Sequence, residues 1–191
     1  MPFELPTPPA PVLETQRLRL RPLEPRDAPA IQRGFDDWEV VKYLHAGLPW
    51  PYPADGAETF IRDSLEKSAR GEQTTWPITL KDADDAPIGL ISLKPNHEER
   101  DMRGFWLARA WWGQGLMTEA AEAVTGYAFE VLGWPFLYVN NAQPNLGSHR
   151  VKEKQGAELI DVKPHAFMSG EYPRETWIIR REAWLARRER S

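Results

Sequence analysis

The chain has 191 residues, which fits one domain better than two. It contains no cysteine, which excludes a disulfide scaffold, a thiolate zinc site and a cysteine nucleophile. With 24 Lys and Arg against 28 Asp and Glu, the net charge of −4 disfavours a dedicated nucleic-acid binder, and no apolar run approaches the roughly 18 residues of a membrane span.

The two ends of the chain differ in composition from the middle. Prolines at positions 2, 6, 8, 9 and 11 predict an extended Pro-rich arm over residues 1–12. The first residues lack the basic and apolar regions of a signal peptide, so we expect a cytoplasmic protein. We expect a single domain over residues 13–184, followed by a basic tail over residues 185–191. A solvated helix face explains that tail better than a surface for an acidic partner.

The first half of the chain predicts one strand and three helices. A strand is expected over 18–23, and a helix follows with Asp27 as its N-cap. A short helix is expected over 38–45. Three alternate prolines then require a loop over 48–53, and a helix follows Asp55 and ends at Gly71.

The second half predicts more strands than helices. Apolar spacing predicts a helix over 116–132 whose inner face carries Ala120, Val124, Tyr127 and Val131. Asn145 is expected to cap another helix, which Gly156 ends. The order of the elements favours a mixed α/β or α+β sheet. The expected strands are 74–80, 87–93, 102–108, 136–140, 158–163 and 175–180.

The segment that points to chemistry is Gly113-Gln-Gly115, between a predicted strand and a predicted helix. Glycines allow close approach of a ligand to the backbone, and a helix N-terminus offers free N–H groups, so the segment suits a pyrophosphate. A tight strand-to-helix turn is the equally simple alternative. Thr118 replaces the third glycine of a dinucleotide fingerprint, and no Gly-Lys-Ser/Thr of a P-loop is present.

The wider sequence resembles a known family over about residues 12–184. Gly104-Phe-Trp-Leu, Trp112-Gly-Gln-Gly and Thr118-Glu-Ala resemble motif A of the GNAT superfamily of acetyl-CoA-dependent acetyltransferases. They look most like its ribosomal-protein N-terminal acetyltransferase (RimJ/RimL-like) branch. Asn145-Leu-Gly-Ser148 with Glu153-Lys-Gln-Gly resembles a second segment of that branch, and Leu13 to Pro22 resembles its first strand.

The resemblance implies an α/β (α+β) GNAT fold with a central mixed, mostly antiparallel sheet of about six to seven strands flanked by helices. The sheet would be splayed between residues 104–108 and 136–140, with the pantetheine arm of acetyl-CoA in the gap. The backbone N–H of Leu107 would then polarise the thioester carbonyl. For Asn141, a bond to pantetheine and a plain loop role are equally open. The implied acetyl-CoA-binding residues are Trp106, Leu107, Ala108, Arg109, Trp112, Gly113, Gln114, Gly115, Leu116, Met117, Thr118, Asn141, Asn145 and Ser148.

Acyl transfer to an amine needs a neutral amine, a polarised thioester and a proton for the leaving thiolate. The matching serine of relatives implies that Ser148 supplies this proton, although its place after Asn145 is the more typical position of a helix-capping hydroxyl. No base stands out. Near the strand ends lie the candidates His97, Glu98, Glu171 and Glu175, each more typical of a solvated surface group, and Glu171 is carried forward as the catalytic candidate.

The lack of an obvious strong base bears on the acceptor. Roughly 10–20% of an α-amine is neutral at pH 7, against well under 0.1% of a lysine, so an α-amine is the better match. We therefore expect transfer of acetyl from acetyl-CoA to a protein N-terminal α-amine. A small-molecule amine and a non-catalytic acyl-CoA-binding protein on the same fold are the alternatives. The acceptor pocket is expected at Trp38, Tyr43, Trp50, His97 and Phe167, and core packing is the simpler explanation for the four aromatic residues among them.

No metal, membrane or dedicated nucleic-acid partner is expected for this protein. The oligomeric state is left open between a monomer and a homodimer.

Overall fold

A computed structural model describes residues 10–190 and contains one eight-stranded sheet in the order β1-β2-β3-β4-β5-β6-β8-β7. Every neighbouring pair is antiparallel except β5 and β6, which are parallel. This confirms the mixed, mostly antiparallel sheet. The strands are β1 (Leu13–Glu14), β2 (Leu18–Leu20), β3 (Thr74–Leu80), β4 (Gly89–Leu93), β5 (Arg103–Leu107), β6 (Phe136–Ala142), β7 (Glu158–Phe167) and β8 (Gly170–Arg180).

The sheet has more strands than the six to seven expected, because the chain forms an extra short edge. The two-residue strand β1, which directly precedes Thr15, pairs with β2. The strand predicted over 18–23 ends earlier, at Leu20. Beyond it, Arg21 and Pro22 lead into a 3₁₀ turn, η1 (Pro25–Asp27). The last two strands are longer than predicted because they form one extended hairpin.

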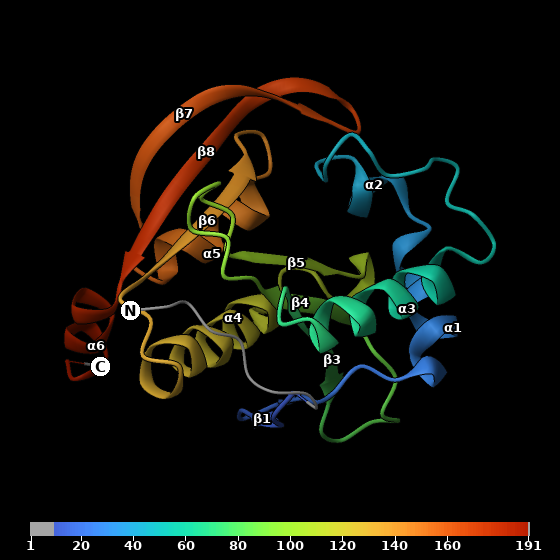
Figure 1. Ribbon diagram of the computed structural model, residues 1–191, viewed down its shortest axis with the longest axis horizontal. Coiled ribbons are helices and arrows are strands. Elements are labelled where there is room, and N and C mark those ends of the chain that lie inside the picture. Colours follow the sequence, from blue (N-terminus) through green and yellow to red (C-terminus); the bar gives the residue numbers. More distant parts are fainter. Residues whose placement is uncertain (1–9, 191) are drawn as a thin grey trace.

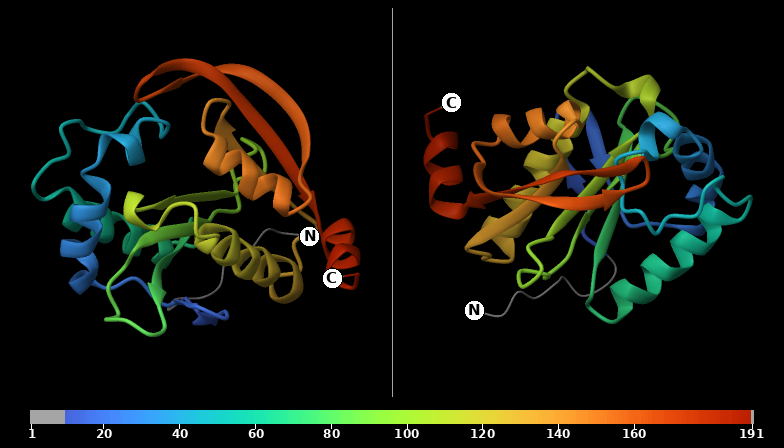
Figure 2. Two further views of the ribbon diagram at one scale, coloured as in Figure 1. Left: turned by 180° about the vertical axis from the view of Figure 1, so that it is seen from behind. Right: turned by 90° about the horizontal axis from the view of Figure 1, so that it is seen from above.

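Helices cover both faces of the sheet (Figures 1 and 2). On one face, Ile31, Ile61 and Leu90 belong to one core cluster that joins two helices to β4. On the other face, Leu116 and Trp184 belong to the main core. The helices are α1 (Ala28–Phe35), α2 (Trp38–Val41), α3 (Gly56–Ala69), η2 (Arg109–Trp111), α4 (Leu116–Gly126), η3 (Tyr127–Val131), α5 (Leu146–Lys154) and α6 (Arg181–Arg188).

The helix predicted over 116–132 changes its winding near its end. It is α-helical as α4 and continues as the π-helical turn η3. Ala120, Val124 and Tyr127 are buried as predicted, but Val131 is 69% exposed. A π turn holds more residues than an α turn, so it rotates the last positions off the predicted stripe. The prediction for Val131 was therefore wrong.

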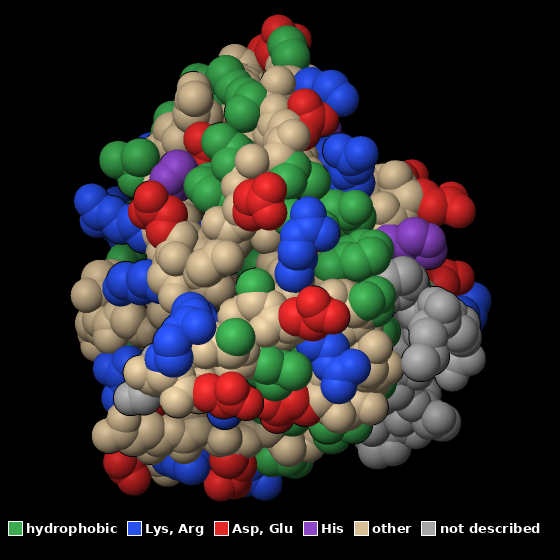
Figure 3. Space-filling model, turned by 90° about the vertical axis from the view of Figure 1, so that its left-hand side faces the viewer, with side chains coloured by type: hydrophobic (Ala, Val, Ile, Leu, Met, Phe, Trp, Pro, Cys, Tyr) green, Lys and Arg blue, Asp and Glu red, His purple; other side chains and the backbone are tan. Residues whose placement is uncertain are grey.

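Residues 1–9 of the expected Pro-rich arm lie outside the described residues. At the other end, residues 185–188 of the expected basic tail lie in α6, which Trp184 anchors with 2% of its surface exposed. Arg187 pairs with Glu122, and Arg188 pairs with Glu130 at 2.6 Å. Figure 3 shows positive and negative side chains interspersed on the side of the molecule that carries α6. No helix within residues 10–190 is both long enough and apolar enough to cross a membrane.

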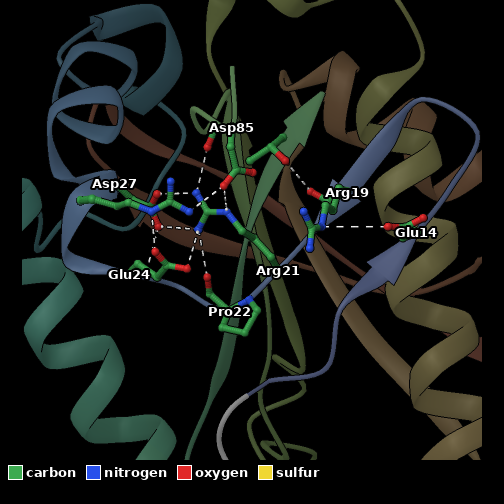
Figure 4. Close-up of polar contacts among 9 residues, drawn as sticks. Glu14, Arg19, Arg21, Pro22, Glu24, Asp27 and Asp85 are labelled. Carbon is green, nitrogen blue, oxygen red and sulfur yellow. Dashed lines mark hydrogen bonds and ion pairs between the residues drawn. The ribbon is translucent and has the colours of Figure 1, made fainter. Parts of the chain in front are cut away.

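A buried ion-pair cluster fixes the end of β2 against η1 and the turn between β3 and β4 (Figure 4). Arg21 is 3% exposed and contacts Asp27 through two nitrogens, at 2.6 and 3.0 Å. Its Nε donates to Asp85 at 2.7 Å. Burial raises the pKa of the Asp85 carboxyl, but the bonds from Arg21 and Arg26 outweigh burial and hold that pKa below its usual value.

Asp27 therefore has a different role from the one predicted. It occupies the N-cap position of α1, but its side chain makes no capping bond to that helix. Its carboxylate instead accepts hydrogen bonds from the Arg21 guanidinium at 2.6 Å and from the backbone N–H of Glu24 at 2.9 Å. Charge-assisted hydrogen bonds to a carboxylate are the strong ones, and here the donor is the guanidinium of Arg21, which directly follows β2.

The β7–β8 hairpin arches away from the sheet and its tip returns to the segment after α2 (Figure 1). The backbone N–H of Met168 donates to the Leu44 carbonyl, and that of Ser169 donates to the Lys42 carbonyl, both at 3.0 Å. The Ser169 hydroxyl donates to the same Lys42 carbonyl at 2.7 Å. The hairpin tip is thus held in place by backbone bonds to a segment far away in the sequence.

Candidate active site

The parallel pair β5–β6 is a discontinuity in the sheet. In the described part of the chain, β5 and β6 share one register pair, Arg103 with Val139. The antiparallel pairing of β5 with β4 continues along the whole strand, from Arg103 to Leu107. The backbone edge of β5 is therefore left open on the β6 side toward its carboxyl end.

Leu107 lies at that open edge. The backbone N–H of Ala108 donates to the Ile88 carbonyl at 2.9 Å. Because successive residues of an antiparallel ladder alternate in direction, the backbone groups of Leu107 face away from β4 and toward β6. The Leu107 carbonyl accepts a bond from the Trp112 indole N–H at 2.7 Å. The Leu107 N–H is thereby placed where a ligand in the gap could accept its hydrogen.

The loop after η2 brings two left-handed glycines to the start of α4. Gly113 has φ +75° and Gly115 has φ +77°. An added Cβ at Gly113 would meet nothing within 4 Å, so the backbone there faces open space. The first four N–H groups of an α-helix have no partner inside the helix, and they carry the positive end of its dipole. The loop and helix together can receive an anionic group.

Arg17, which sequence reasoning did not single out, flanks this loop. Its Nη1 donates to the Gln114 carbonyl at 3.0 Å, and its Nη2 lies 3.6 Å from an ideal Cβ at Gly115. Its Nε pairs with Glu119 at 2.7 Å. The Thr15 hydroxyl donates to the same carboxylate at 2.6 Å. Glu119 therefore connects the β1–β2 turn to the first turn of α4.

We expect Glu119→Gln to make the fold less stable at neutral pH and to lose that effect in acid. Burial raises the pKa of the Glu119 carboxyl, but the bonds from Thr15 and Arg17 outweigh it and lower that pKa. A carboxyl whose pKa is lower in the folded state stabilises the fold above its unfolded pKa, near 4.3, and this contribution is lost as the pH falls. Denaturant titrations of both proteins between pH 7 and pH 3 measure the difference.

Glu58→Gln is the matched control, because Glu58 occupies the first turn of α3 as Glu119 does in α4, and its side chain is exposed. We expect a small change in stability for this control, because Glu58 is exposed. A Glu119→Gln protein whose deficit persisted unchanged at pH 3 would contradict the assignment of the deficit to the ionised carboxylate.

The start of α5 carries the predicted cap and the predicted proton donor. The Asn145 side chain accepts the backbone N–H of Ser148 at 3.2 Å, which confirms Asn145 as the N-cap. The backbone N–H of Ser148 is thus hydrogen-bonded to Asn145, while the Ser148 hydroxyl is bonded to a different residue. Its Oγ accepts a hydrogen bond from Lys152 Nζ at 2.8 Å.

Sequence reasoning missed Lys152. It is 1% exposed, and its Nζ also donates to the Ser148 carbonyl at 3.1 Å. The ring of Phe105 on β5 lies 5.4 Å from the same nitrogen. Burial, together with the charge of Arg103, lowers the pKa of the Lys152 ammonium well below its usual value. The available signal was the spacing, since position 152 is one helical turn after Ser148.

Glu175 is buried, which corrects the expectation of a solvated surface group. It is 4% exposed. Its carboxylate accepts a hydrogen bond from Asn141 Nδ2 at 2.8 Å and lies 2.8 Å from His149 Nδ1. The other ring nitrogen of His149 lies 3.4 Å from Glu153. With a carboxylate at each ring nitrogen, His149 serves as a bridge between α5 and β8.

The same network occupies the Asn141 amide. Its Nδ2 donates to the Ala142 carbonyl at 3.0 Å as well as to Glu175, and its Oδ1 accepts the Trp177 indole N–H at 3.0 Å. Both N–H donors of this amide are therefore used inside the protein. Only the second lone pair of Oδ1 and the backbone of Asn141 remain for a ligand.

The other three base candidates lie on exposed segments. His97 and Glu98 are exposed in the loop between β4 and β5, and His97 Nδ1 lies 3.2 Å from the Pro95 carbonyl. Glu171 is exposed near the tip of the β7–β8 hairpin.

The predicted acceptor aromatics form two neighbouring groups around α2. Trp38 and Trp50 are each 38% exposed, and their ring centroids are 5.4 Å apart. Tyr43 packs edge-on against Tyr172 at 5.8 Å, and Tyr172 also contacts Phe167 at 6.4 Å. The contact between Tyr43 and Tyr172 thus joins the segment after α2 to the β7–β8 hairpin.

Comparison with known proteins gives consistent matches. Residues 17–158 match the family model described as "Acetyltransferase (GNAT) domain". "Probable N-acetyltransferase YjcK" from Bacillus subtilis (strain 168) is 32% identical over 152 residues, covering 76% of this chain and 82% of the relative.

Solved structures share the fold at low sequence identity. An acetyltransferase of the GNAT family from Bacillus anthracis has a TM-score of 0.77 at 20% identity, covering 90% of this chain and 99% of that one. The complex of RimL, a ribosomal L7/L12 alpha-N-protein acetyltransferase, with coenzyme A has a TM-score of 0.74 at 16% identity, covering 89% and 98%.

Proposed function

The chain belongs to the GNAT acetyltransferase family and is an acetyl-CoA-dependent N-acetyltransferase, and we propose that its acceptor is the α-amine of a protein N-terminus. The observation that carries the site is the open edge of β5 leading directly into the glycine loop at the start of α4. The cytoplasmic location and the choice between monomer and homodimer remain predictions from the sequence.

The residues of the loop fit a pyrophosphate. Gly113 and Gly115 adopt the left-handed backbone conformation, Gly113 faces open space, and Arg17 adds a positive charge beside the loop. We propose that the backbone from Trp112 to Thr118 holds the phosphates of acetyl-CoA, and that the β5 end from Trp106 to Arg109 holds the pantetheine arm. When bound, acetyl-CoA supplies the activated acetyl group.

Two groups of the chain are proposed to act on the reacting atoms. The Leu107 N–H would donate to the thioester oxygen and stabilise the negative charge that develops there. The Ser148 hydroxyl would give its proton to the leaving sulfur as the C–S bond breaks and would regain a proton from solvent. The attacking nitrogen, which forms the new C–N bond, would release one proton in return.

The choice of acceptor rests on the positions of the base candidates. His149 is held between two carboxylates, Glu175 is buried in the same network, and Glu171 is exposed at the hairpin tip. An acceptor that is already partly neutral needs no strong base, and an α-amine meets this condition far better than a lysine. RimL, which shares the fold, is named as an alpha-N-protein acetyltransferase, and this is consistent with the choice.

The test is acetylation of short peptides that begin with Ser, Ala or Met and carry one internal lysine. We expect release of free CoA with peptides whose α-amine is free, and mass spectrometry should place the acetyl group on the N-terminus. The same peptides with a formylated N-terminus should not react.

The other arms of the assay decide among the alternatives. Turnover of polyamines or free amino acids in place of peptides would assign the protein to small-molecule acceptors. Binding of acetyl-CoA without turnover of any amine would favour a non-catalytic acyl-CoA-binding protein.

A further inference from the structure

A buried lysine on α5 has no place in the chemistry described so far. Lys152 is 1% exposed, and its Nζ donates to Ser148 Oγ at 2.8 Å and to the Ser148 carbonyl at 3.1 Å. Its third neighbour is the face of Phe105, 5.4 Å away. Within residues 10–190, both hydrogen bonds of this nitrogen are therefore to Ser148.

The charges around Lys152 do not explain its burial as an ion pair. Arg103 on β5 is itself 3% exposed, and its charge repels that of Lys152. The charge of Glu175 on β8 favours the ammonium form of Lys152, but the Glu175 carboxylate is hydrogen-bonded to Asn141 and His149. A buried lysine without a contacting carboxylate opposes folding, and an apolar side chain of similar length would fill the same space without that penalty.

We propose that Lys152 is a positioning residue for Ser148, holding the Ser148 oxygen so that its hydroxyl hydrogen points to the sulfur of coenzyme A. The inference rests on the proposed role of Ser148 in acetyl transfer. Because Lys152 fills an acceptor lone pair of Ser148 Oγ, the hydroxyl hydrogen is the donor that remains for a ligand. A hydroxyl that accepts one bond also becomes a stronger donor in the next.

The absence of cysteine makes this inference testable on the sulfur itself. The chain contains no cysteine, so the thiol of bound CoA is the single thiol in the sample. A hydrogen bond from Ser148 to the thiolate form lowers the pKa of that thiol below its value in free CoA. The pKa is read from the ultraviolet absorbance of the thiolate during a pH titration of the protein–CoA complex, and no acceptor is required.

We expect Lys152→Met to raise the thiol pKa of bound CoA by about one unit relative to wild type, a tenfold change in the acid dissociation constant. Ser148→Ala should raise it by at least as much, and the double variant should match Ser148→Ala. Lys154→Met is the control, because Lys154 is exposed on the same helix, and it should leave the thiol unchanged. Lys152→Met should also raise the melting temperature, since it replaces a buried amine that no carboxylate contacts with an apolar side chain.

The outcomes separate this inference from the proposed acceptor. CoA binding to each variant is first measured by calorimetry. An unchanged thiol pKa in CoA-bound Lys152→Met would overturn the inference, and so would an effect of Lys152→Met that persists in the Ser148→Ala background. Failure of all peptides as acceptors would overturn the proposed acceptor and leave the thiol result standing. Failure of the wild-type protein to bind CoA would overturn both.

Discussion

Gly113→Leu is expected to weaken acetyl-CoA binding by at least about a hundredfold, equivalent to roughly 2.7 kcal/mol. Gly113 has φ +75° and nothing within 4 Å of an added Cβ, so a side chain there would project into the space proposed for the pyrophosphate. Phosphate groups bind such loops through closely approached backbone N–H groups, which a bulky side chain blocks. Isothermal titration with acetyl-CoA and with free CoA measures the loss.

Gly71→Leu is the matched control for backbone strain. Gly71 ends α3 with φ +70° and also has nothing within 4 Å of an added Cβ. Both leucines would adopt a left-handed conformation, at a cost of about 1–2 kcal/mol of fold stability each. We expect the two variants to lose similar stability while Gly71→Leu keeps its affinity. Equal affinities of Gly113→Leu and wild type would refute the proposed phosphate position.

Arg21→Met is expected to destabilise the fold by about 3–5 kcal/mol. The substitution removes the guanidinium that contacts Asp27 through two nitrogens and Asp85 through a third (Figure 4). Asp27 is 1% exposed, so its carboxylate would remain buried with the single backbone donor of Glu24. Chemical denaturation, with the free energy of unfolding extrapolated to water, gives the value.

Two further variants test the physical cause. Arg19 lies on β2, two residues before Arg21, but its side chain is 49% exposed and its Nε is 4.0 Å from Glu14, so Arg19→Met should cost less than about 1 kcal/mol. Adding Asp27→Leu to Arg21→Met removes the stranded carboxylate and should recover a large part of the loss. A double variant as unstable as the sum of both single variants would show that packing of Arg21, and not the stranded charge, is responsible.

Local signals in the sequence predicted the elements around the site. Thr74–Leu80 is a strand with the predicted bounds, and Asn145 caps α5 as expected. The glycine pair at 113 and 115 has the left-handed backbone that a strand-to-helix turn with two glycines favours. Each of these features depends on residues within a few positions of one another, and that is the range over which capping, turn chemistry and hydrophobic periodicity act.

Periodicity was less informative where the chain departs from regular winding. The π turn of η3 shifts Val131 to the surface, and the two-residue strand β1 is too short to show alternation. The β7–β8 hairpin extends beyond its predicted strands because its tip is held by the segment after α2. Those bonds join residues that are more than a hundred positions apart, so no local sequence pattern predicts them.

The sequence by itself determined the family, the glycine loop and the serine on the capped helix, because these depend on residue types at short spacings. The tertiary structure decided how the charged residues are used. Arg17 and Glu119 meet across the loop, Glu175 is buried beneath α5, and Lys152 contacts Ser148 inside the protein. A charged residue is expected at the surface when judged from sequence, because burial of its charge is unfavourable. Only folding supplies the partners that make such burial possible.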